Sequence, residues 1–315
     1  MNEDKSRDPA LYLGVEIGGT KLQVFAGDHS GRVTERHRFP ADASGGGPAI
    51  RTQLETIIPP LAKRLRPAAI GVGFGGPVDW KTGQVSRSHQ VEGWSGFPIG
   101  SWLSSLAQAP VYVDNDADVG ALGEALRGAG VGCNPVFYVT LGSGVGGGLV
   151  VDGKIYHGAP PGEAEIGHIR LDRSGVIIES RCAGWAVDAK IRAAVARNPD
   201  SALARCVGTA KSNEARFLAA ALAQKDPLAE SILEETAGDL AFGLSHVMQL
   251  FHPQIIVLGG GLSLVGEPLR AAVERLARPF IMEVFAPSLR IALAKLSEDV
   301  VPVGALCLAL ERHLG

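Results

Sequence analysis

The chain has 315 residues, which is enough for two domains of about 150 residues each or for one large α/β unit. It carries 30 Lys and Arg against 33 Asp and Glu, and the net charge of −3 provides no global field that would draw it to nucleic acid or to anionic lipid. Hydrophobic residues make up 46% and aromatic residues 6%, with 41 glycines, which predicts an aliphatic core with many tight turns rather than a disordered chain.

Cysteine usage and the N-terminal sequence both favour an intracellular protein. Cys133, Cys182, Cys206 and Cys307 are scattered and form no Cys-x-x-Cys pair, so we expect reduced thiols and neither a redox pair nor a zinc knuckle. Residues 1–9 are charged and lack an apolar core, and glycine or charge interrupts every long apolar run. We therefore expect a cytoplasmic protein without a membrane span.

Two segments share one order of predicted elements, a strand, a glycine-rich turn and a second strand. The first copy spans residues 11–26, with its turn at 17–20, and an Asp-to-Gly turn at 28–31 leads into a third strand. The second copy spans residues 136–157, with a glycine-rich loop at 141–148 and a last segment at 155–156. This duplication predicts two related lobes.

A shorter pattern follows each copy, in which an aliphatic strand runs directly into glycines. Residues 69–74 lead into Gly75 and Gly76, and residues 255–258 lead into 259–261. We expect the four glycine corners to converge on one cleft. Strands that alternate with helices predict mixed α/β sheets with helices packed on them. The predicted helices are 50–65, 117–127, 185–197, 213–251 in two or three pieces, 267–278 and 303–313.

The glycine corners are candidates for phosphate binding. Glycine lets backbone N–H groups approach an anion without a Cβ in the way, although the same glycines also serve plain hairpins. Two matched corners, one with Thr20 and Lys21 and one with Thr140 and Ser143, favour phosphate binding. No Walker A string occurs, and the Gly-x-Gly-x-x-Gly match at 142–147 leads into a predicted strand where a dinucleotide site needs a helix. We interpret that match as accidental.

Five motifs follow one another along the chain: Val15–Lys21, Asp114–Asp118, Thr140–Gly148, Gly162–His168 and Ile256–Gly261. In this order they resemble the ROK family of bacterial sugar kinases and repressors, over nearly the whole chain. The resemblance implies an α/β fold of the two-lobed, actin-like ATPase (ribonuclease H-like) type, with mixed sheets flanked by helices and a ligand cleft between the lobes. We expect residues 1–113 with 301–315 in the N-terminal lobe and 114–300 in the C-terminal lobe.

The same resemblance assigns roles to single residues. It implies ATP as the phosphoryl donor with Mg²⁺, which Glu16 would bind directly or through water, and Asp116 as the base that activates a sugar hydroxyl. The implied contacts are Gly18, Gly19, Thr20 and Lys21 for the first phosphate loop, Thr140, Gly142, Ser143 and Gly144 for the second, Gly259, Gly260 and Gly261 for the adenosine, and Asn115, Glu165, His168, Glu179 and Gly76 for the sugar.

Simpler roles exist for some of these residues. Asp116 or Asp118 can cap the helix that is predicted from Ala117, because Asp is favoured at N-caps. Glu165 and His168 can be ordinary loop residues. We favour catalysis and sugar binding, since a Glu, an Asn and a His together satisfy sugar hydroxyls with direction, and phosphoryl transfer needs a carboxylate near the attacking hydroxyl.

The chain departs from the family pattern in three places. Residues 170–181 contain no cysteine and only Cys182 follows, so we expect no structural zinc, which requires four ligands. Glu16 stands where the family usually has Asp. Only ten residues precede Leu11, so we expect no DNA-binding domain and no nucleic-acid partner.

We therefore expect an ATP-dependent hexose kinase of the glucokinase or hexokinase type, acting on the 6-hydroxyl, and the resemblance suggests a homodimer. The alternative is a catalytically silent protein that senses sugar or nucleotide. An actin-like assembly protein is a third hypothesis, which no sequence feature recommends. The sequence leaves glucose, fructose, mannose and N-acetylated sugars open as substrates.

Overall fold

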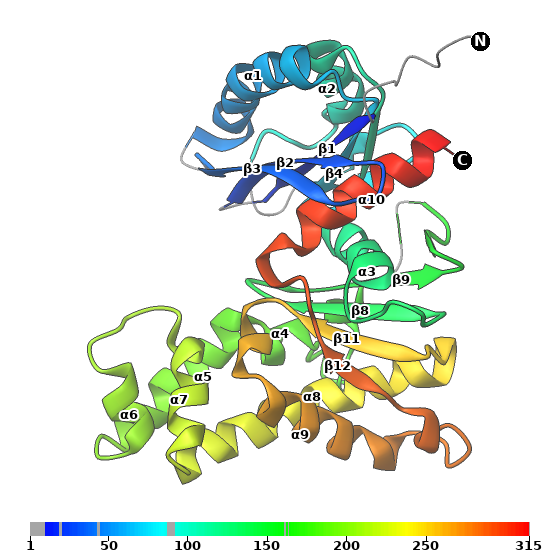
Figure 1. The fold of residues 1–315 in the computed structure, drawn as a ribbon. Coiled ribbons are helices and arrows are strands. Elements are labelled where there is room, and N and C mark those ends of the chain that lie inside the picture. The colour runs from blue at the N-terminus through cyan, green and yellow to red at the C-terminus, as the bar shows by residue number, and fades with distance from the viewer. Residues whose placement is uncertain are drawn as a thin grey trace, which may run out of the picture. The chain divides into compact units, whose positions relative to one another are not determined.

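The structure of the chain is a computed structural model. It describes residues 10–18, 21–42, 45–86, 92–160, 162 and 164–314 (Figure 1). The chain divides into two compact units. The first unit comprises residues 1–127, 153–163 and 298–315, and the second comprises 128–152 and 164–297.

The boundary that the sequence suggested between residues 113 and 114 lies inside the first unit. At that point strand β7 (Val111–Asn115) runs directly into helix α3 (Asp116–Arg127). Both elements are held in the first unit, because β7 pairs with its sheet and α3 packs against helix α10 (Val300–Leu314). Asp116 is therefore a residue of the first unit.

The first unit is built on a mixed sheet with the strand order β3-β2-β1-β4-β7. β1 pairs antiparallel with β2 and β2 with β3, which confirms the predicted meander. β1 also pairs parallel with β4, and β4 pairs parallel with β7. The strands are β1 Leu11–Ile17, β2 Lys21–Asp28, β3 Val33–Pro40, β4 Ala69–Phe74 and β7 Val111–Asn115, and the unit also holds β5 Val78–Asp79, β6 Gln84–Val85 and β10 Lys154–Ile155.

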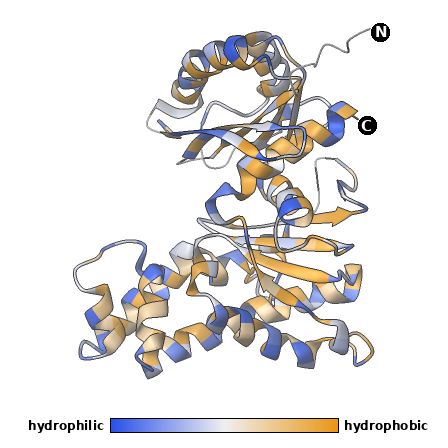
Figure 2. Ribbon diagram, viewed as in Figure 1, coloured by the Kyte–Doolittle hydropathy of each residue, from blue (hydrophilic) through white to orange (hydrophobic). Residues whose placement is uncertain are grey.

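Helices cover both faces of this sheet, and strand alternation decides which residues meet them. Leu13 and Val15 of β1 are fully buried in a core shared with α1 (Gly46–Leu65) and α2 (Ile99–Ala107). Tyr12 points to the other face, where it packs with Leu306 of α10. Figure 2 shows α10 coloured largely as hydrophobic.

The backbone of helix α10 is in direct contact with the backbone of the sheet and with that of α3. A Cβ added to Gly71 of β4 would lie 1.9 Å from the carbonyl oxygen of Ala305 in α10. A Cβ added to Gly304 of α10 would lie 1.8 Å from the carbonyl oxygen of Val119 in α3. Real Cβ atoms do not approach backbone atoms so closely, so glycine is required at both positions.

We predict that Gly304→Ala destabilises the protein although alanine is the better helix former. The new methyl group would force α10 and α3 apart, and overpacking of this kind costs about 1–3 kcal/mol or more. The matched control is Gly238→Ala in α8 (Pro227–Phe251), where an added Cβ meets nothing within 4 Å and we expect a gain of up to about 1 kcal/mol. Urea unfolding checks both values, and equal effects of the two substitutions would contradict the packing argument.

The second unit repeats this strand pattern, with β9-β8-β11-β12 in place of β2-β1-β4-β7. β8 pairs antiparallel with β9 and parallel with β11, and β11 pairs parallel with β12. The predicted duplication is therefore visible in the topology. The elements are β8 Val136–Leu141, β9 Val145–Val151, β11 Ile255–Gly259, β12 Ile291–Leu293, α4 Glu179–Cys182, α5 Gly184–Arg197, α6 Ala202–Val207, α7 Leu218–Ala223, α8 Pro227–Phe251 and α9 Glu267–Ala277.

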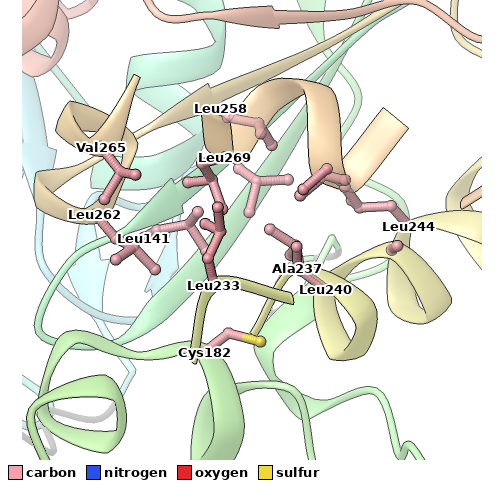
Figure 3. Close-up of a cluster of buried hydrophobic side chains, with 14 of the residues drawn as sticks. Leu141, Cys182, Leu233, Ala237, Leu240, Leu244, Leu258, Leu262, Val265 and Leu269 are labelled. Atoms are coloured by element: carbon pink, nitrogen blue, oxygen red, sulfur yellow. The ribbon is translucent and has the colours of Figure 1, made fainter. Parts of the chain in front are cut away.

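The core of the second unit forms where α8 and α9 pack on the parallel strands. Figure 3 shows Leu258 of β11 facing side chains of these helices, among them Leu240 and Leu269. All three side chains are fully buried. Asp226 caps the start of α8, since its carboxylate accepts hydrogen bonds from the backbone N–H groups of Leu228 and Ala229.

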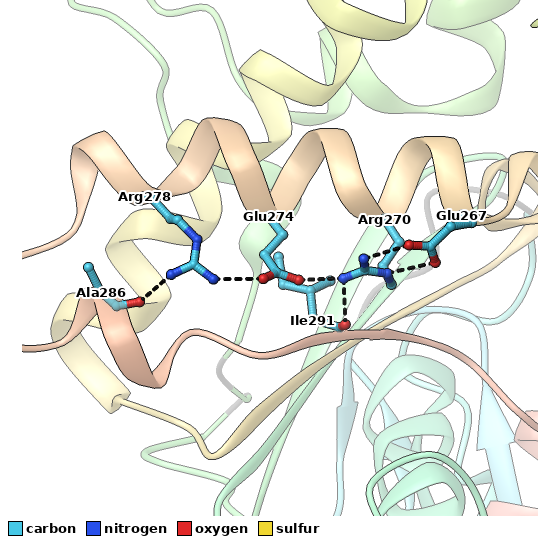
Figure 4. A network of polar contacts seen from close by, with 6 residues as sticks. All are labelled: Glu267, Arg270, Glu274, Arg278, Ala286 and Ile291. Carbon is cyan, nitrogen blue, oxygen red and sulfur yellow. Dashed lines mark hydrogen bonds and ion pairs between the residues drawn. The ribbon is translucent and has the colours of Figure 1, made fainter.

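An ionic network runs along α9 and reaches the edge strand of this sheet (Figure 4). The Arg270 guanidinium pairs with Glu267 and Glu274 and also donates to the carbonyl oxygen of Ile291 in β12 at 3.3 Å. Arg278 pairs with Glu274 at 2.7 Å. Partly exposed pairs of this kind contribute little free energy each, but together they fix how α9 lies along β12.

The predicted helices all form, with shifted ends, and the segment 213–251 divides into a 3₁₀ turn (Glu214–Phe217), α7 and α8. The interpretation of 141–148 as a loop was wrong for its second half. Val145–Val151 is strand β9, in which Gly147 pairs with Val139. The glycine is needed there for close packing, because a Cβ on Gly147 would lie 2.6 Å from the carbonyl oxygen of Ala164.

Among the described residues, none of the helices combines the length and the apolar character that a membrane crossing needs. The four cysteines are free thiols, and Cys182 and Cys307 are buried. Burial raises the pKa of Cys182 to about 12 and that of Cys307 to about 11.

Candidate active site

Three parallel strands of the first unit end side by side. Ile17 of β1 is in register with Phe74 of β4, which is in register with Asn115 of β7. The residues that follow these ends therefore meet. A Cβ on Gly75 would lie 3.5 Å from the Asp116 Oδ2 atom and 3.6 Å from the Gly18 Cα atom. The predicted base thus lies beside the first glycine corner, at the carboxyl ends of strands where α/β proteins bind ligands.

The first glycine corner is described at both of its ends. The backbone N–H of Gly18 donates to the carbonyl oxygen of Lys21 at 2.9 Å, which closes the turn. The Lys21 ammonium lies 3.8 Å from the Glu298 carboxylate, and both side chains are exposed. The predicted phosphate contacts Gly19 and Thr20 lie outside the described residues.

Asn115 is fixed between the glycine corner at Gly76 and the first turn of α3. Its Nδ2 donates to the carbonyl oxygen of Gly76 at 3.1 Å, and its Oδ1 accepts from the backbone N–H of Ala117 at 2.8 Å. The cap contact to the first turn of α3 therefore comes from Asn115. Asp116 is the first residue of α3, one position after this contact. A second hydrogen on Nδ2 and a second lone pair on Oδ1 give Asn115 further hydrogen-bonding capacity.

A buried hydrogen bond between Asp114 and His157, which the sequence did not reveal, supports this turn. Asp114 is only 3% exposed, and its Oδ2 lies 2.6 Å from Nε2 of His157. Its Oδ1 accepts from the backbone N–H of Asn115 at 3.1 Å. Asp114 thus supports the backbone from which Asn115 and Asp116 project.

Glu16 of β1 is held by a second contact that the sequence did not reveal. The buried Gln23 donates from Nε2 to Oε2 of Glu16 at 2.5 Å. The Arg38 Nε donates to Oε1 of Gln23 at 2.8 Å and its guanidinium pairs with Asp299 at 2.6 Å. Because Arg can only donate, this contact fixes which end of the Gln23 amide faces Glu16.

The environment of Glu16 disfavours its negative charge. Burial raises its pKa to about 7, and the negative charge of Asp116 adds to this, against the opposing effects of the Gln23 hydrogen bond and of Lys21. A nearby cation would relieve both the desolvation and the repulsion between the two carboxylates. Glu16 therefore fits the Mg²⁺ that the resemblance implies, since Mg²⁺ is commonly bound by one or two carboxylates together with substrate phosphates.

Within the part of the chain that the structure describes, no three His, Cys, Asp or Glu side chains gather as a metal site. A metal cage made by protein side chains alone is therefore not formed by those residues. The expectation of no structural zinc stays a prediction.

In the second unit, two glycine corners meet at the ends of parallel strands. Thr140 of β8 is in register with Gly259 of β11. Gly260 has φ +77°, and a Cβ there would lie 2.5 Å from the backbone nitrogen of Leu141. The predicted adenosine corner therefore contacts the predicted second phosphate loop.

Neither packing nor backbone conformation requires glycine at positions 142 and 261. An added Cβ would meet nothing within 4 Å at Gly142 or at Gly261, and neither residue has a positive φ. Open space beside a bare backbone is what a closely approaching phosphate or base would use. Ser143, between Gly142 and Gly144, is exposed.

Glu179 supports the second glycine loop by a hydrogen bond to its backbone. Its Oε2 accepts from the backbone N–H of Val145 at 3.0 Å, and a Cβ on Gly144 would lie 2.7 Å from the same oxygen. The backbone N–H of Gly184 donates to the carbonyl oxygen of Gly142 at 2.8 Å. The start of α4 and α5 therefore fixes the loop, and Glu179, predicted as a sugar contact, lies against it.

Glu165 precedes a short 3₁₀ segment (Ile166–His168), and His168 is its last residue. The segment packs against β9. A Cβ on Gly167 would lie 2.1 Å from the carbonyl oxygen of Val145. The two side chains are 60% and 69% exposed, and the His168 Nδ1 lies 3.6 Å from the Glu165 Oε2. A fixed backbone thus presents an acceptor and an imidazole to solvent together.

Comparison with known proteins gives one consistent result. The sequence model described as "ROK family" matches residues 12–312. The glucokinase of Halalkalibacterium halodurans is 29% identical, over 93% of this chain and 93% of that protein. The xylose repressor of Caldicellulosiruptor bescii is 24% identical, over 98% of this chain and 80% of the repressor.

A solved structure agrees with this result. The chain superposes on a ROK family glucokinase from Streptomyces griseus, crystallised with glucose and AMPPNP, with a TM-score of 0.84 and 27% identity, covering 96% of this chain and 100% of that one. This likeness confirms the predicted fold class, a mixed α/β fold of the actin-like ATPase type.

We predict that Glu16 makes stability depend on pH. A raised carboxyl pKa stabilises the folded state below the unfolded value of 4.5, and this contribution is lost as pH rises towards about 7. The free energy of unfolding of the native protein should therefore fall relative to that of Glu16→Gln between these values, by roughly 3 kcal/mol in total.

Urea unfolding in metal-free buffer, followed by tryptophan emission, measures this difference. The signal reports mainly the first unit, which contains Trp80, Trp94 and Trp102. A difference between the two proteins that does not change from pH 4.5 to pH 8 would contradict the assignment.

Proposed function

Because this chain belongs to the ROK family and is a sugar kinase by its likeness to the kinases of that family, we propose that it transfers the γ-phosphoryl group of ATP to the 6-hydroxyl of a hexose, with Asp116 as the general base. The observation that carries this proposal is the position of the Asp116 carboxylate beside the Gly18 corner, at the ends of parallel strands.

The phosphate contacts in this proposal come from the two glycine corners. Gly18, Gly19, Thr20 and Lys21 form the first loop. Thr140, Gly142, Ser143 and Gly144 form the second, with adenosine beside Gly259, Gly260 and Gly261. The open space at Gly142 and Gly261 supports this assignment, because a phosphate or a base can approach a backbone that carries no Cβ.

Glu16, oriented by Gln23, is the proposed metal ligand. Mg²⁺ bound there with the phosphates of ATP would offset the negative charge of the transferred group. The hydrogen bond from Gln23 keeps one carboxylate oxygen of Glu16 in place and leaves the other for a direct or water-mediated contact. The Glu16 side chain, which is longer than the Asp that the family usually has at this position, is thus held in one orientation.

In the proposed step, the sugar oxygen forms a bond to the γ-phosphorus as the bond from that phosphorus to the bridging oxygen of ADP breaks. The hydroxyl proton passes to the Asp116 carboxylate. The sugar would be oriented by hydrogen bonds to Asn115, Glu165, His168 and Glu179 and to the backbone at Gly76. Of these, Asn115 and Gly76 already hold each other in the structure.

We expect Asp116→Asn to lower the rate of sugar-dependent ADP release by about 10²–10⁴-fold, because the amide cannot accept the proton. ADP release with Mg-ATP is measured across glucose, mannose, fructose, N-acetylglucosamine and N-acetylmannosamine, which also names the substrate. Calorimetry should show that the variant still binds AMPPNP and sugar. Asp172→Asn, in an exposed turn of the second unit, is the control and should leave the rate unchanged. An unchanged rate in Asp116→Asn would contradict the role of the base.

The alternative is a sensor that binds sugar or nucleotide without turnover. It is favoured by the similarity to a xylose repressor. Binding of AMPPNP and sugar by the native protein, with no ADP release for any sugar of the panel, would select this alternative.

A further inference from the structure

The first unit contains a hollow of about 360 Å³ that the proposed reaction does not use. Its floor is β7, and its walls come from the β5–β6 turn and from the C-terminal half of α10. A volume of this size lies in the range of small-molecule sites. Its lining includes Trp80, Lys81, Tyr112, Asp114, Leu308 and Arg312.

Trp80 is the centre of this lining. The His157 ring stacks on the indole at 4.2 Å between centroids, with 20° between the planes. The Arg312 guanidinium lies 4.8 Å from the indole centroid, and the Lys81 ammonium lies 5.3 Å from it. The indole Nε1–H is buried and has no hydrogen-bond partner among the described residues.

The acidic groups nearby are already engaged. Both oxygens of Asp114 accept hydrogen bonds, one from His157 and one from the backbone of Asn115. Glu311, which lies 3.5 Å from the Arg312 Nε, also pairs with Lys154 at 3.6 Å.

The remaining polar groups of the hollow are mainly donors. The indole N–H of Trp80, Lys81 and Arg312 can only donate, and the Tyr112 hydroxyl can both donate and accept. A buried donor without an acceptor is costly, and a guanidinium and an ammonium both donate to the oxygens of a phosphate group. The ligand that satisfies these groups is small, rich in acceptors and negatively charged.

We propose that this hollow binds a small organic phosphate, and that occupation of the hollow changes the activity of the neighbouring Asn115 and Asp116. The second half of this statement rests on the proposed kinase function. Asp114 is the link, because it lines the hollow and also accepts a hydrogen bond from the backbone N–H of Asn115, which in turn holds Gly76. A ligand that displaces Asp114 therefore displaces the catalytic turn, and the coupling acts in both directions.

Binding is tested without turnover, so that its failure and the failure of the kinase proposal are distinguishable. Glucose 6-phosphate, inorganic phosphate and glucose are titrated by calorimetry and by tryptophan emission. We expect glucose 6-phosphate to bind. Lys81→Gln and Arg312→Gln should each weaken this binding about tenfold or more through loss of a charge-assisted contact. Trp80→Phe should remove most of the emission change.

The controls are Lys63→Gln and Arg66→Gln, exposed residues of the same unit, which should bind as the native protein does. Circular dichroism checks that each variant is folded, and Arg312→Lys should restore part of the affinity. Unchanged affinity in Lys81→Gln and Arg312→Gln would overturn the site. Inorganic phosphate that binds as tightly as glucose 6-phosphate would overturn the assignment to an organic phosphate.

The regulatory half is tested by the rate of ADP release at increasing glucose 6-phosphate. We expect Arg312→Gln to respond less than the native protein and less than Arg66→Gln. An equal response in all three proteins would overturn the coupling.

Discussion

The backbone contacts of α10 are the constraint on which the first unit depends. This helix touches β4 at Gly71 and α3 at Gly304 so closely that no side chain fits at either position. The contacts fix α3, and with it Asp116, relative to the ends of the parallel strands. The catalytic geometry that we propose therefore rests on glycines that touch no substrate. A side chain at either glycine would move the base and the first glycine corner apart.

The second constraint is electrostatic. Glu16 and Asp116 are carboxylates held near each other, and burial raises the pKa of Glu16 to about 7. Gln23 and Arg38 hold Glu16 in one orientation although its charge is disfavoured. An arrangement of this kind stores a charge conflict that a cation relieves, which suits a site that handles ATP with a metal ion. The disfavoured charge of Glu16 lowers the free energy of unfolding, and this cost arises at the proposed metal site.

The sequence predicted the parts of the site that follow from local pattern. Strands that run into glycines, and the Asn115–Asp116 pair after an aliphatic strand, could be located without a structure. The contact of Asp114 with His157 could not, because the two residues lie 43 positions apart. The contact of Gln23 with Glu16 depends on the register of β1 and β2, which places the two residues opposite each other. The role of Gly147 was also hidden, since a glycine kept for close packing has the same sequence appearance as a glycine in a turn. The family resemblance supplied the roles that no local pattern carries.

In the proposed reaction, a phosphoryl group moves from ATP to the primary hydroxyl of a sugar. Phosphorus NMR of the reaction with the accepted hexose tests it most directly, because phosphorus on a primary carbon couples to two protons and that on a secondary carbon to one. We predict a phosphomonoester signal split into a triplet, in an amount equal to the ADP formed. A doublet would contradict the 6-hydroxyl, and inorganic phosphate as the only new phosphorus product would contradict transfer to a sugar.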